Sequence, residues 1–385
     1  MLHIGAPRAH LAELFDVVRG SHRARTVCSI QNSDHRTLYS GRRWFLDGQV
    51  EIDSTAAVTR SATASLLDPD GRAGLDSSAP LDGALGFDRY LHLRREYWLP
   101  YAQEWISVPV FTGPISGVTR SGPSISVEAQ GKELLAMETA WTPRTWRKGT
   151  KRIVIIEELM RERAGEWAFA LPQGWGARIG RDWSVMRRPG EDVHTIWARA
   201  QTQARSLGDK QLFYDARGIL RARTQPVKPV WQIRAEDLSD APQVSERTSD
   251  IVNTVIVTGG VPSGGKTPIT ATAELDWNHP WSPSSLGRRG VGRRIISQSE
   301  DSSLVTQKDA EAAAKRALKV HERGSVELTA TALPVLWLEP RDLITVDVAG
   351  KPVPMRLHKA TFPLSGDLMS IGHLRTYRPR RRSRR

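Results

Sequence analysis

The sequence predicts a β-rich α+β fold in which two tube-like β-domains, of barrel or sandwich type, flank an α+β insert, with one helix packed on the second β-domain. Three observations carry this prediction. Side chains alternate strictly in an early segment, turn-rich connections separate further short strands, and the strand pattern returns after about residue 244. Helical spacing is confined to the start, the middle and one late segment, so strands should form most of the cores.

The clearest strand pattern lies at residues 58–66. One side carries Val58, Arg60, Ala62, Ala64 and Leu66. The other side carries Thr59, Ser61, Thr63 and Ser65. Because successive side chains point to opposite faces of a strand, this segment should have one covered face and one polar face. The Asp-Pro-Asp-Gly sequence of residues 68–71 then predicts a turn.

The rest of the first β-domain is assigned by the same reasoning. Residues 90–98, 106–111 and 124–130 are predicted strands, separated by Asp-, Gly- and Pro-rich connections. A short helix should precede them, because Leu11, Leu14, Phe15 and Val18 form an apolar stripe that ends at Gly20. That stripe is interrupted by acids, which excludes a signal peptide.

The middle of the chain changes to helical spacing. A helix is predicted over residues 151–164, ending at Gly165, and a second begins at an Asp192 cap and ends before Gly208. Two apolar strands then flank residues 215–218, which predicts a hairpin with Gly218 in the left-handed region. Seven tryptophans fall in or beside this insert, namely Trp141, Trp146, Trp167, Trp175, Trp183, Trp197 and Trp231.

After about residue 244 the strand pattern returns. Predicted strands cover residues 251–258, 325–331, 342–348 and 354–361. Between them, residues 307–323 predict a helix with a capping box of Thr306 and Asp309, a small-residue face and a stop at Gly324. The expected division is an N-terminal arm at 1–21, β-domains at 22–136 and 244–377, the insert at 137–243 and a basic tail at 378–385.

Composition limits the class of protein. The 385 residues carry a net charge of +13 with a pI near 10.2, and six arginines in residues 378–385 leave +7 for the rest. We expect that tail to be solvated, because like charges repel and nothing apolar is available to bury. No window approaches 18 uninterrupted apolar residues, so no transmembrane segment is predicted. The single cysteine, Cys28, excludes an internal disulfide and should be a buried strand residue.

One motif looks catalytic. Residues 260–267 match the phosphate-loop pattern GxxxxGK[ST], with Lys266 in the phosphate-contacting position. The helix that such a loop must precede is not expected, because Pro268 follows at once and β-branched alternation continues. Asp347 is the available acidic partner for a metal and fits that role poorly. A glycine-rich hairpin loop is the favoured interpretation.

Other chemistry is sparse, and no catalytic, cofactor-binding or metal-binding residue is predicted. The ten histidines show no HExxH spacing, and one cysteine cannot form a structural zinc site. Glu157 and Glu158 are expected on a solvated helix face, although a glycosidase pair cannot be judged from spacing alone. The tryptophans are expected to be core or interface residues, with stacking on a sugar as the alternative.

Several segments in order resemble tail hub, or minor tail, proteins of long-tailed phages that infect actinobacteria. Residues 50–71 and 108–135 resemble the first β-domain of that family, and residues 191–223 resemble its helix-plus-hairpin insert. The NTVIVTGG segment, the polar DWNHPWSPSSLGRRG segment, the helix 307–323 and the final strands resemble its second β-domain. Related hubs occur in contractile tails and type VI secretion spikes.

The resemblance implies a non-enzymatic baseplate hub of the virion tail tip, folded in the bacterial cytoplasm before assembly. It implies a homotrimer that presents six similar β-domains, joins a distal tail or tail tube protein to tip or fibre proteins, and lets tape-measure protein and DNA pass. A channel that conducts DNA should not bind it tightly, so the excess positive charge should face away from the channel or lie in the C-terminal segment 378–385. The alternatives are a carbohydrate-binding tail adhesion protein using the tryptophan-rich insert and a nucleotide hydrolase using Lys266.

Overall fold

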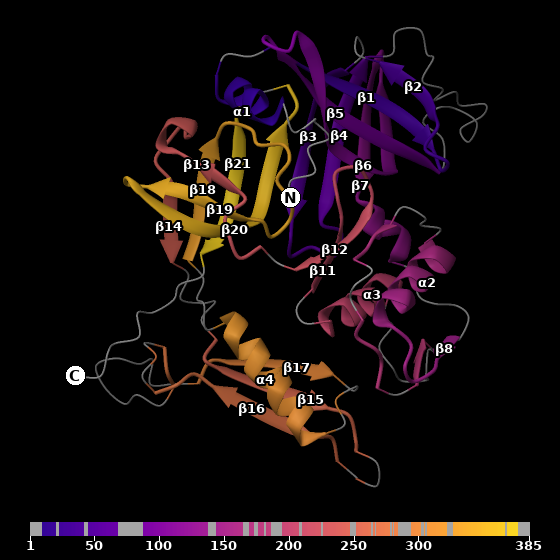
Figure 1. Ribbon diagram of the computed structural model, residues 1–385, viewed down its shortest axis with the longest axis vertical. Coiled ribbons are helices and arrows are strands. Elements are labelled where there is room, and N and C mark those ends of the chain that lie inside the picture. Colours follow the sequence, from indigo (N-terminus) through magenta and orange to yellow (C-terminus); the bar gives the residue numbers. More distant parts are fainter. Residues whose placement is uncertain are drawn as a thin grey trace. The chain divides into compact units, whose positions relative to one another are not determined.

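A computed structural model (Figure 1) describes residues 10–20, 23–41, 45–67, 88–137, 144–164, 169–172, 176–180, 182–185, 195–207, 210–224, 226–246, 252–262, 265, 267–277, 279, 281–283, 294–301, 304, 306–321, 326–365 and 368–375. The chain divides into two compact units. Unit 1 contains residues 1–241 and 330–372, and unit 2 contains residues 242–329 and 373–385. Each unit is described by itself.

Unit 1 is built on one large, mostly antiparallel sheet. Its hydrogen-bonded strand order is β21-β20-β3-β4-β7-β6-β5-β1-β2, and β19 pairs with both β20 and β13. The strands are β1 (Ala24–Asn32), β2 (Thr37–Gly41), β3 (Phe45–Asp53), β4 (Arg60–Leu67), β5 (Arg89–Leu99), β6 (Glu104–Ser121), β7 (Ser124–Gln130), β13 (Trp231–Ile233), β19 (Leu343–Val348), β20 (Lys351–Pro363) and β21 (Met369–Arg375). The sheet is open, because β2 ends the order with β1 as its one described partner.

The sheet joins strands from opposite ends of the chain. β20 pairs with β3 from Lys359 opposite Asp53 to Pro363 opposite Gln49. Figure 1 shows this as yellow β20 beside indigo β3. The early and late parts of the sequence therefore share one framework in unit 1.

The strand predicted from alternation at residues 58–66 is confirmed from Arg60 onward, as β4, whereas Val58 and Thr59 precede the strand and Thr59, expected on the polar face, is buried. Ala62, Ala64 and Leu66 are at most 3% exposed, and the hydroxyl residues between them reach solvent. The predicted strands at 90–98, 106–111 and 124–130 are also confirmed, although 106–111 is the centre of the much longer β6. The predicted turn at residues 68–71 lies outside the described residues.

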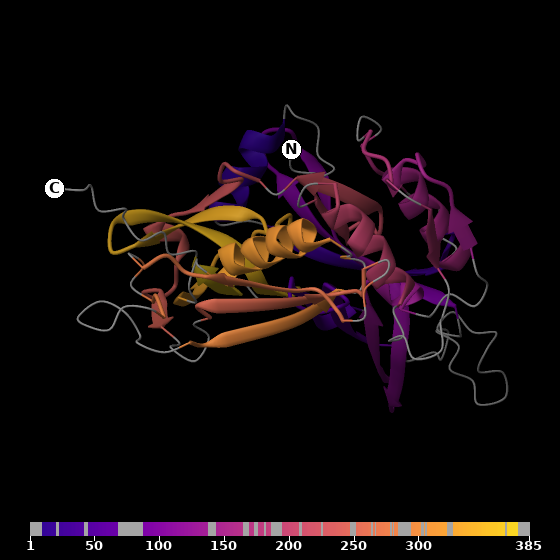
Figure 2. The same ribbon diagram turned by 90° about the horizontal axis from the view of Figure 1, so that it is seen from below.

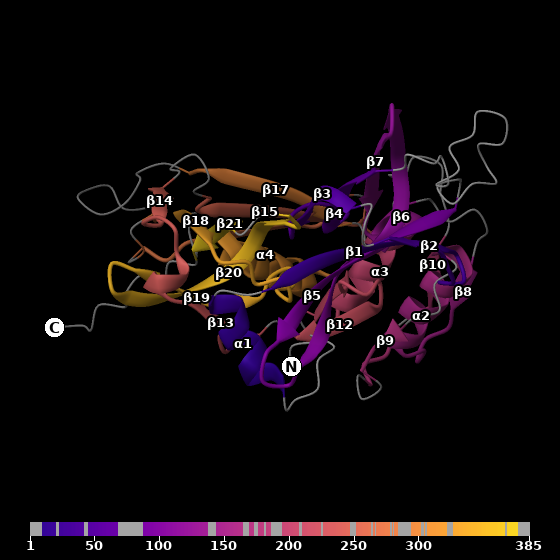
Figure 3. The same ribbon diagram turned by 90° about the horizontal axis from the view of Figure 1, so that it is seen from above.

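β6 bends from one set of partners to another at Gly113. Its first part pairs with β5 as far as Pro114, and its last part pairs with β7 from Ile115 onward. A Cβ at Gly113 would lie 1.9 Å from the backbone oxygen of Gln130, so only glycine permits this crossing. Beyond the bend, the β6–β7 hairpin projects from the rest of unit 1 (Figure 3).

The insert forms a small core of helices and short strands within unit 1. It contains the 3₁₀ helix η2 (Lys132–Ala136), β8 (Arg144–Trp146), α2 (Arg152–Ala164), β9 (Phe169–Ala170), β10 (Trp183–Val185), α3 (Ile196–Arg205), β11 (Lys210–Tyr214) and β12 (Leu220–Thr224). α2 and α3 pack against β11 and β12 around a shared apolar cluster. The predicted hairpin is confirmed, and Gly218 has a φ of 70°.

The predicted capping residue of one helix, α3, was wrong. Thr195, not Asp192, caps α3, because its side chain accepts a hydrogen bond of 3.1 Å from the backbone N–H of Ala198. Both residue types cap helices well, so the sequence alone chose the wrong one. Asp192, Gly165 and Gly208 lie outside the described residues.

Unit 2 is a helix packed on a small sheet (Figure 2). β15 (Thr254–Gly259) lies between antiparallel β16 (Thr270–Glu274) and parallel β17 (Ile296–Asp301). α4 (Gln307–His321) covers one face through Ala310 and Ala314, which are fully buried. Half of the predicted capping box is confirmed, since the Thr306 hydroxyl accepts from the backbone N–H of Asp309 at 3.2 Å; the Asp309 carboxylate accepts from that same hydroxyl at 2.7 Å. β14 (Gln243–Glu246) pairs with β18 (Val326–Ala332).

The β-rich α+β class is confirmed, with strands dominating and the late helix packed on a sheet. The predicted division into five segments stays a prediction. The predicted N-terminal helix is α1 (Leu11–Arg19), with Gly20 after it, and the segments from 376 onward and Gly324 lie outside the described residues.

Gly113→Ala should destabilise the protein by about 1–3 kcal/mol, because the new methyl group must displace backbone at the β6 bend. Gly117→Ala is the matched control in the same strand, since its Cβ would meet only the flexible Glu128 side chain at 3.3 Å. Urea denaturation measures both variants. Equal stability losses in the two variants would contradict the role assigned to Gly113.

Candidate functional site: a buried ionic junction

Arg60 places a buried charge at the start of β4. Its side chain is 3% exposed, on the same face as the core residues of that strand. One guanidinium nitrogen donates to the carbonyl of Val110 in β6 at 2.8 Å, and another donates to Glu339 at 2.5 Å. Because a buried charge must be paired, Glu339 is held against β4 and β6.

The β11–β12 hairpin brings its own charges to the same place. Asp215 is 3% exposed, and its carboxylate accepts the backbone N–H groups of Arg217 at 2.9 Å and Ile219 at 3.0 Å. The other oxygen of Asp215 accepts from the Arg221 guanidinium. The hairpin turn is therefore organised by one buried carboxylate, which also neutralises an arginine.

A second arginine ties the hairpin to the loop before β19. Arg223 donates to Asp342 at 2.9 Å and to the Pro340 carbonyl at 2.8 Å. Gln211 donates to that same carbonyl at 3.0 Å. Asp342 in turn accepts the backbone N–H of Glu339 at 2.8 Å, which fixes the loop that presents Glu339.

Glu133 completes the group from η2. It is fully buried, and the Thr59 hydroxyl donates to it at 2.6 Å. We call the set of seven ionisable side chains the junction. Its members are Arg60, Glu133, Asp215, Arg221, Arg223, Glu339 and Asp342.

The junction holds three guanidinium groups and four carboxyl groups, so one carboxyl is in excess. Burial, with Asp215 and Asp342 adding to it, raises the pKa of Glu339 from 4.5 to about 7, although Arg60 and Arg223 oppose the rise. Burial also raises the pKa of Glu133 and of Asp342. These raised pKa values make the strength of the junction depend on pH.

The hairpin tip makes a second contact, to β5 and β6. The Thr112 hydroxyl donates to the Ala216 carbonyl at 3.1 Å and lies 2.8 Å from His92 Nδ1. A Cβ at Gly218 would come within 3.2 Å of Thr112, so the turn approaches the strand closely. Burial, with nearby Arg94 and His35, lowers the pKa of His92 to about 4, so the imidazole is neutral there.

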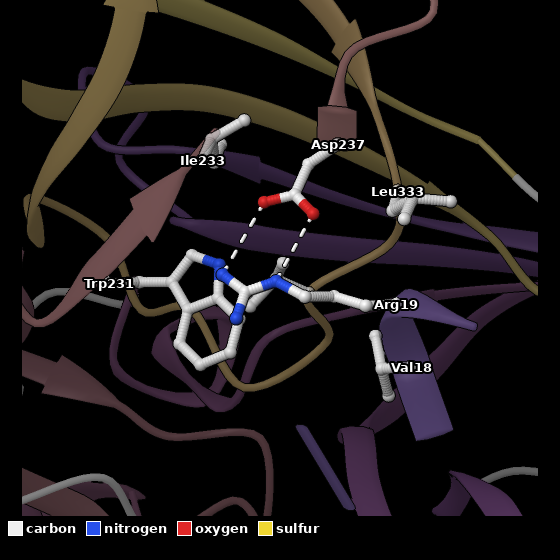
Figure 4. Close-up of a pocket in the computed structure, with 7 residues that line it drawn as sticks. Val18, Arg19, Trp231, Ile233, Asp237 and Leu333 are labelled. Carbon is white, nitrogen blue, oxygen red and sulfur yellow. Dashed lines mark hydrogen bonds and ion pairs between the residues drawn. The ribbon is translucent and has the colours of Figure 1, made fainter. Parts of the chain in front are cut away.

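α1 is fastened at the other side of unit 1, where a shallow pocket lies (Figure 4). Arg19 donates to Asp237 at 3.1 Å and to the Gln232 carbonyl at 3.1 Å, and its guanidinium lies 4.9 Å from the Trp231 ring. Phe15 packs edge-on against Trp231 at 4.7 Å. These contacts fill the polar side of the pocket with the protein's own groups, so it is a helix-docking site.

The residues singled out in the sequence have structural roles. Cys28 is fully buried in β1, and burial raises its pKa to about 12. Asp347 accepts the backbone N–H of Gly350 at 2.7 Å in the β19–β20 turn. Glu158, expected on a solvated helix face, is 32% exposed and also accepts hydrogen bonds from Arg144 at 2.8 Å and from Trp146 Nε1 at 2.7 Å.

The phosphate-loop pattern connects β15 to β16, which are antiparallel neighbours. The hairpin interpretation is confirmed, because β16 stands where a phosphate loop needs a helix. Lys266 itself lies outside the described residues. Among the residues that the structure describes, no group of three or more His, Cys, Asp or Glu side chains is placed to hold a metal ion.

The described tryptophans of the insert are mostly core. Trp146 and Trp197 are 5% and 4% exposed, and Trp197 stacks on Tyr214 at 5.8 Å. Trp183 packs against Trp146 at 5.1 Å. Trp141, Trp167 and Trp175 lie outside the described residues. No described helix is long and apolar enough to cross a membrane.

Comparisons identify proteins with the same fold. No protein-family model and no curated protein sequence matches the chain. Among solved structures it is similar to the 43 kDa tail protein of prophage MuSo2 from Shewanella oneidensis, with a TM-score of 0.60 and 13% identity over 92% of this chain and 99% of that chain. A tail protein from Neisseria meningitidis MC58 gives 0.59 and 13% identity, over 91% and 96%. A chain of a Francisella PdpA–VgrG complex gives 0.51 and 8%, over 98% and 62%.

These similarities show a fold shared with two tail proteins and with a chain of the PdpA–VgrG complex. They support the resemblance to tail proteins at the level of the fold. The narrower resemblance, to hubs of phages that infect actinobacteria, stays a prediction.

Glu339→Gln should flatten the pH dependence of stability between pH 4.5 and about 7. The folded protein holds a proton there that the unfolded chain has lost, so wild-type stability falls as pH rises through this window, by at most about 3 kcal/mol from this group. The glutamine variant lacks that fall. Urea denaturation at a series of pH values measures it.

Glu311→Gln, on the exposed face of α4, is the matched control and should follow the wild-type curve. A Glu339→Gln curve parallel to that of the wild type would show that Glu339 does not take up the proton.

Proposed function

We propose that this chain is a structural, non-enzymatic protein of a phage tail, and specifically a hub of the tail baseplate. The observation that carries the proposal is the similarity to two tail proteins over 92% and 91% of this chain and nearly all of theirs. An argument from fold alone does not identify a function, so the direct evidence has to come from assembly.

The described charged groups support a structural role. Each buried carboxylate of the junction contacts a guanidinium, a hydroxyl or a backbone N–H that fixes chain geometry. These contacts hold the insert hairpin against the first β-domain and the late strands. Such an arrangement suits a protein that must keep its shape within an assembly.

The finer proposal follows the resemblance drawn from the sequence. Three copies form a ring that joins the distal tail or tail tube protein to tip or fibre proteins, at the tail tip of the virion. The ring surrounds a channel for tape-measure protein and genomic DNA during ejection. The symmetry of a closed ring determines the symmetry of the two surfaces that contact the tube protein and the tip proteins.

Light scattering across a concentration series, alone and with the neighbouring tail proteins, tests this proposal. The expected result is a particle of about three times the chain mass of 42.9 kDa. A chain that remains at 42.9 kDa at every concentration, with neighbours present, would exclude the ring.

A further inference from the structure

Most of the excess positive charge falls outside the two β-rich ranges. Residues 137–243 contain 19 lysines and arginines against 13 aspartates and glutamates. Residues 378–385 contain six arginines and no acid, so the remaining residues are nearly balanced, at 30 against 29. The insert therefore carries nearly all of the net positive charge that lies outside the C-terminal tail.

Two segments of the insert bring cations together. Residues 147–152 and 177–179 form a short antiparallel ladder, in which Ile179 donates and accepts backbone hydrogen bonds of 3.0 and 2.9 Å with the first segment. Lys151 lies directly opposite Arg178 in this ladder. We call the four exposed cations of these segments the basic ladder. They are Arg147, Lys148, Lys151 and Arg178.

The turn that begins the ladder holds the Arg178 head group. Gly149 has a φ of 91°, and its carbonyl accepts a 2.6 Å hydrogen bond from the Arg178 guanidinium. Asp182 is the acid at this place, and its carboxylate accepts the backbone N–H of Lys148 at 2.7 Å. Within the described residues, no ion pair involves any of the four cations.

The arrangement is electrostatically unfavourable by itself. Like charges placed directly opposite each other on paired strands destabilise the pairing. The Arg178 guanidinium also donates a hydrogen bond to the Gly149 carbonyl, which fixes its head group in place. An anion bound across the ladder would offset this repulsion.

The surroundings indicate the class of anion. Protein interfaces usually bury an apolar centre, but none of the large exposed apolar side chains of the described residues lies between residues 144 and 224. Single-stranded nucleic acid is usually held by aromatic stacking as well as by charge. The two ladder segments contain no aromatic residue.

We propose that the basic ladder is a binding site for a linear polyphosphodiester without bases, of the poly(glycerol phosphate) type found at cell surfaces. The repeating phosphates would pair with the lysine and arginine head groups along the ladder. The ladder offers positive charge, and it has no groups that would recognise a nucleobase or the side chain of a partner protein. This goes beyond a hub function and does not depend on ring formation.

Binding of poly(glycerol phosphate) to the full chain, measured by calorimetry over a series of salt concentrations, tests the proposal. With about three phosphate contacts, the logarithm of the affinity should fall with the logarithm of salt concentration with a slope near −2. Lys148→Glu combined with Lys151→Glu should weaken binding about tenfold or more and reduce the slope.

Lys315→Glu combined with Arg316→Glu is the matched control. It makes the same charge change on the exposed face of α4 and leaves the C-terminal arginines in place. Lys148→Gln with Lys151→Gln provides a milder ladder variant, and thermal melting checks that each variant is folded. We expect weaker binding in both ladder variants and unchanged binding in the α4 variant.

Two outcomes would overturn the proposal. Equal losses in the ladder and α4 variants would show attraction to net charge without a site. Tighter binding of single-stranded DNA with the same number of phosphates, lost in the ladder variants, would assign the site to nucleic acid. Light scattering on the same samples separates a failure of this site from a failure of ring formation.

Discussion

The buried ion pair between Arg60 and Glu339 is the contact on which the architecture of unit 1 depends. It joins β4 to a loop 279 residues later in the chain. That loop is fixed by Asp342 and, through Arg223, by the insert hairpin. Without Glu339 the guanidinium of Arg60 would stay buried with one fewer partner, which destabilises the fold. These contacts therefore link the first strands, the insert and the last strands.

This coupling explains why the insert is part of unit 1 despite its own apolar core. The hairpin tip is held by Thr112 on one side and by the ionic junction on the other. The excess carboxyl of the junction makes the contact sensitive to protonation, because burial and the neighbouring carboxylates raise the pKa of Glu339 to about 7. The chain thus carries a group at the junction that titrates near neutral pH.

Local features of the fold could be predicted from the sequence, and long-range ones could not. Alternation located β4, and the small-residue face of α4 indicated a helix packed closely on a sheet. Arg60 stood out on an apolar face, which is the signal that a buried partner exists. Its partner Glu339 lies too far along the chain for any local pattern to identify. The pairing of β20 with β3 was missed for the same reason.

We propose that this chain forms a ring at the end of a phage tail. Electron cryomicroscopy of the assembled particle tests it most directly. We expect unit 1, with its open sheet and insert, to fit density for a closed ring between the tail tube and the tip. Density for this chain in a peripheral fibre, or its absence from the tail tip, would contradict the account.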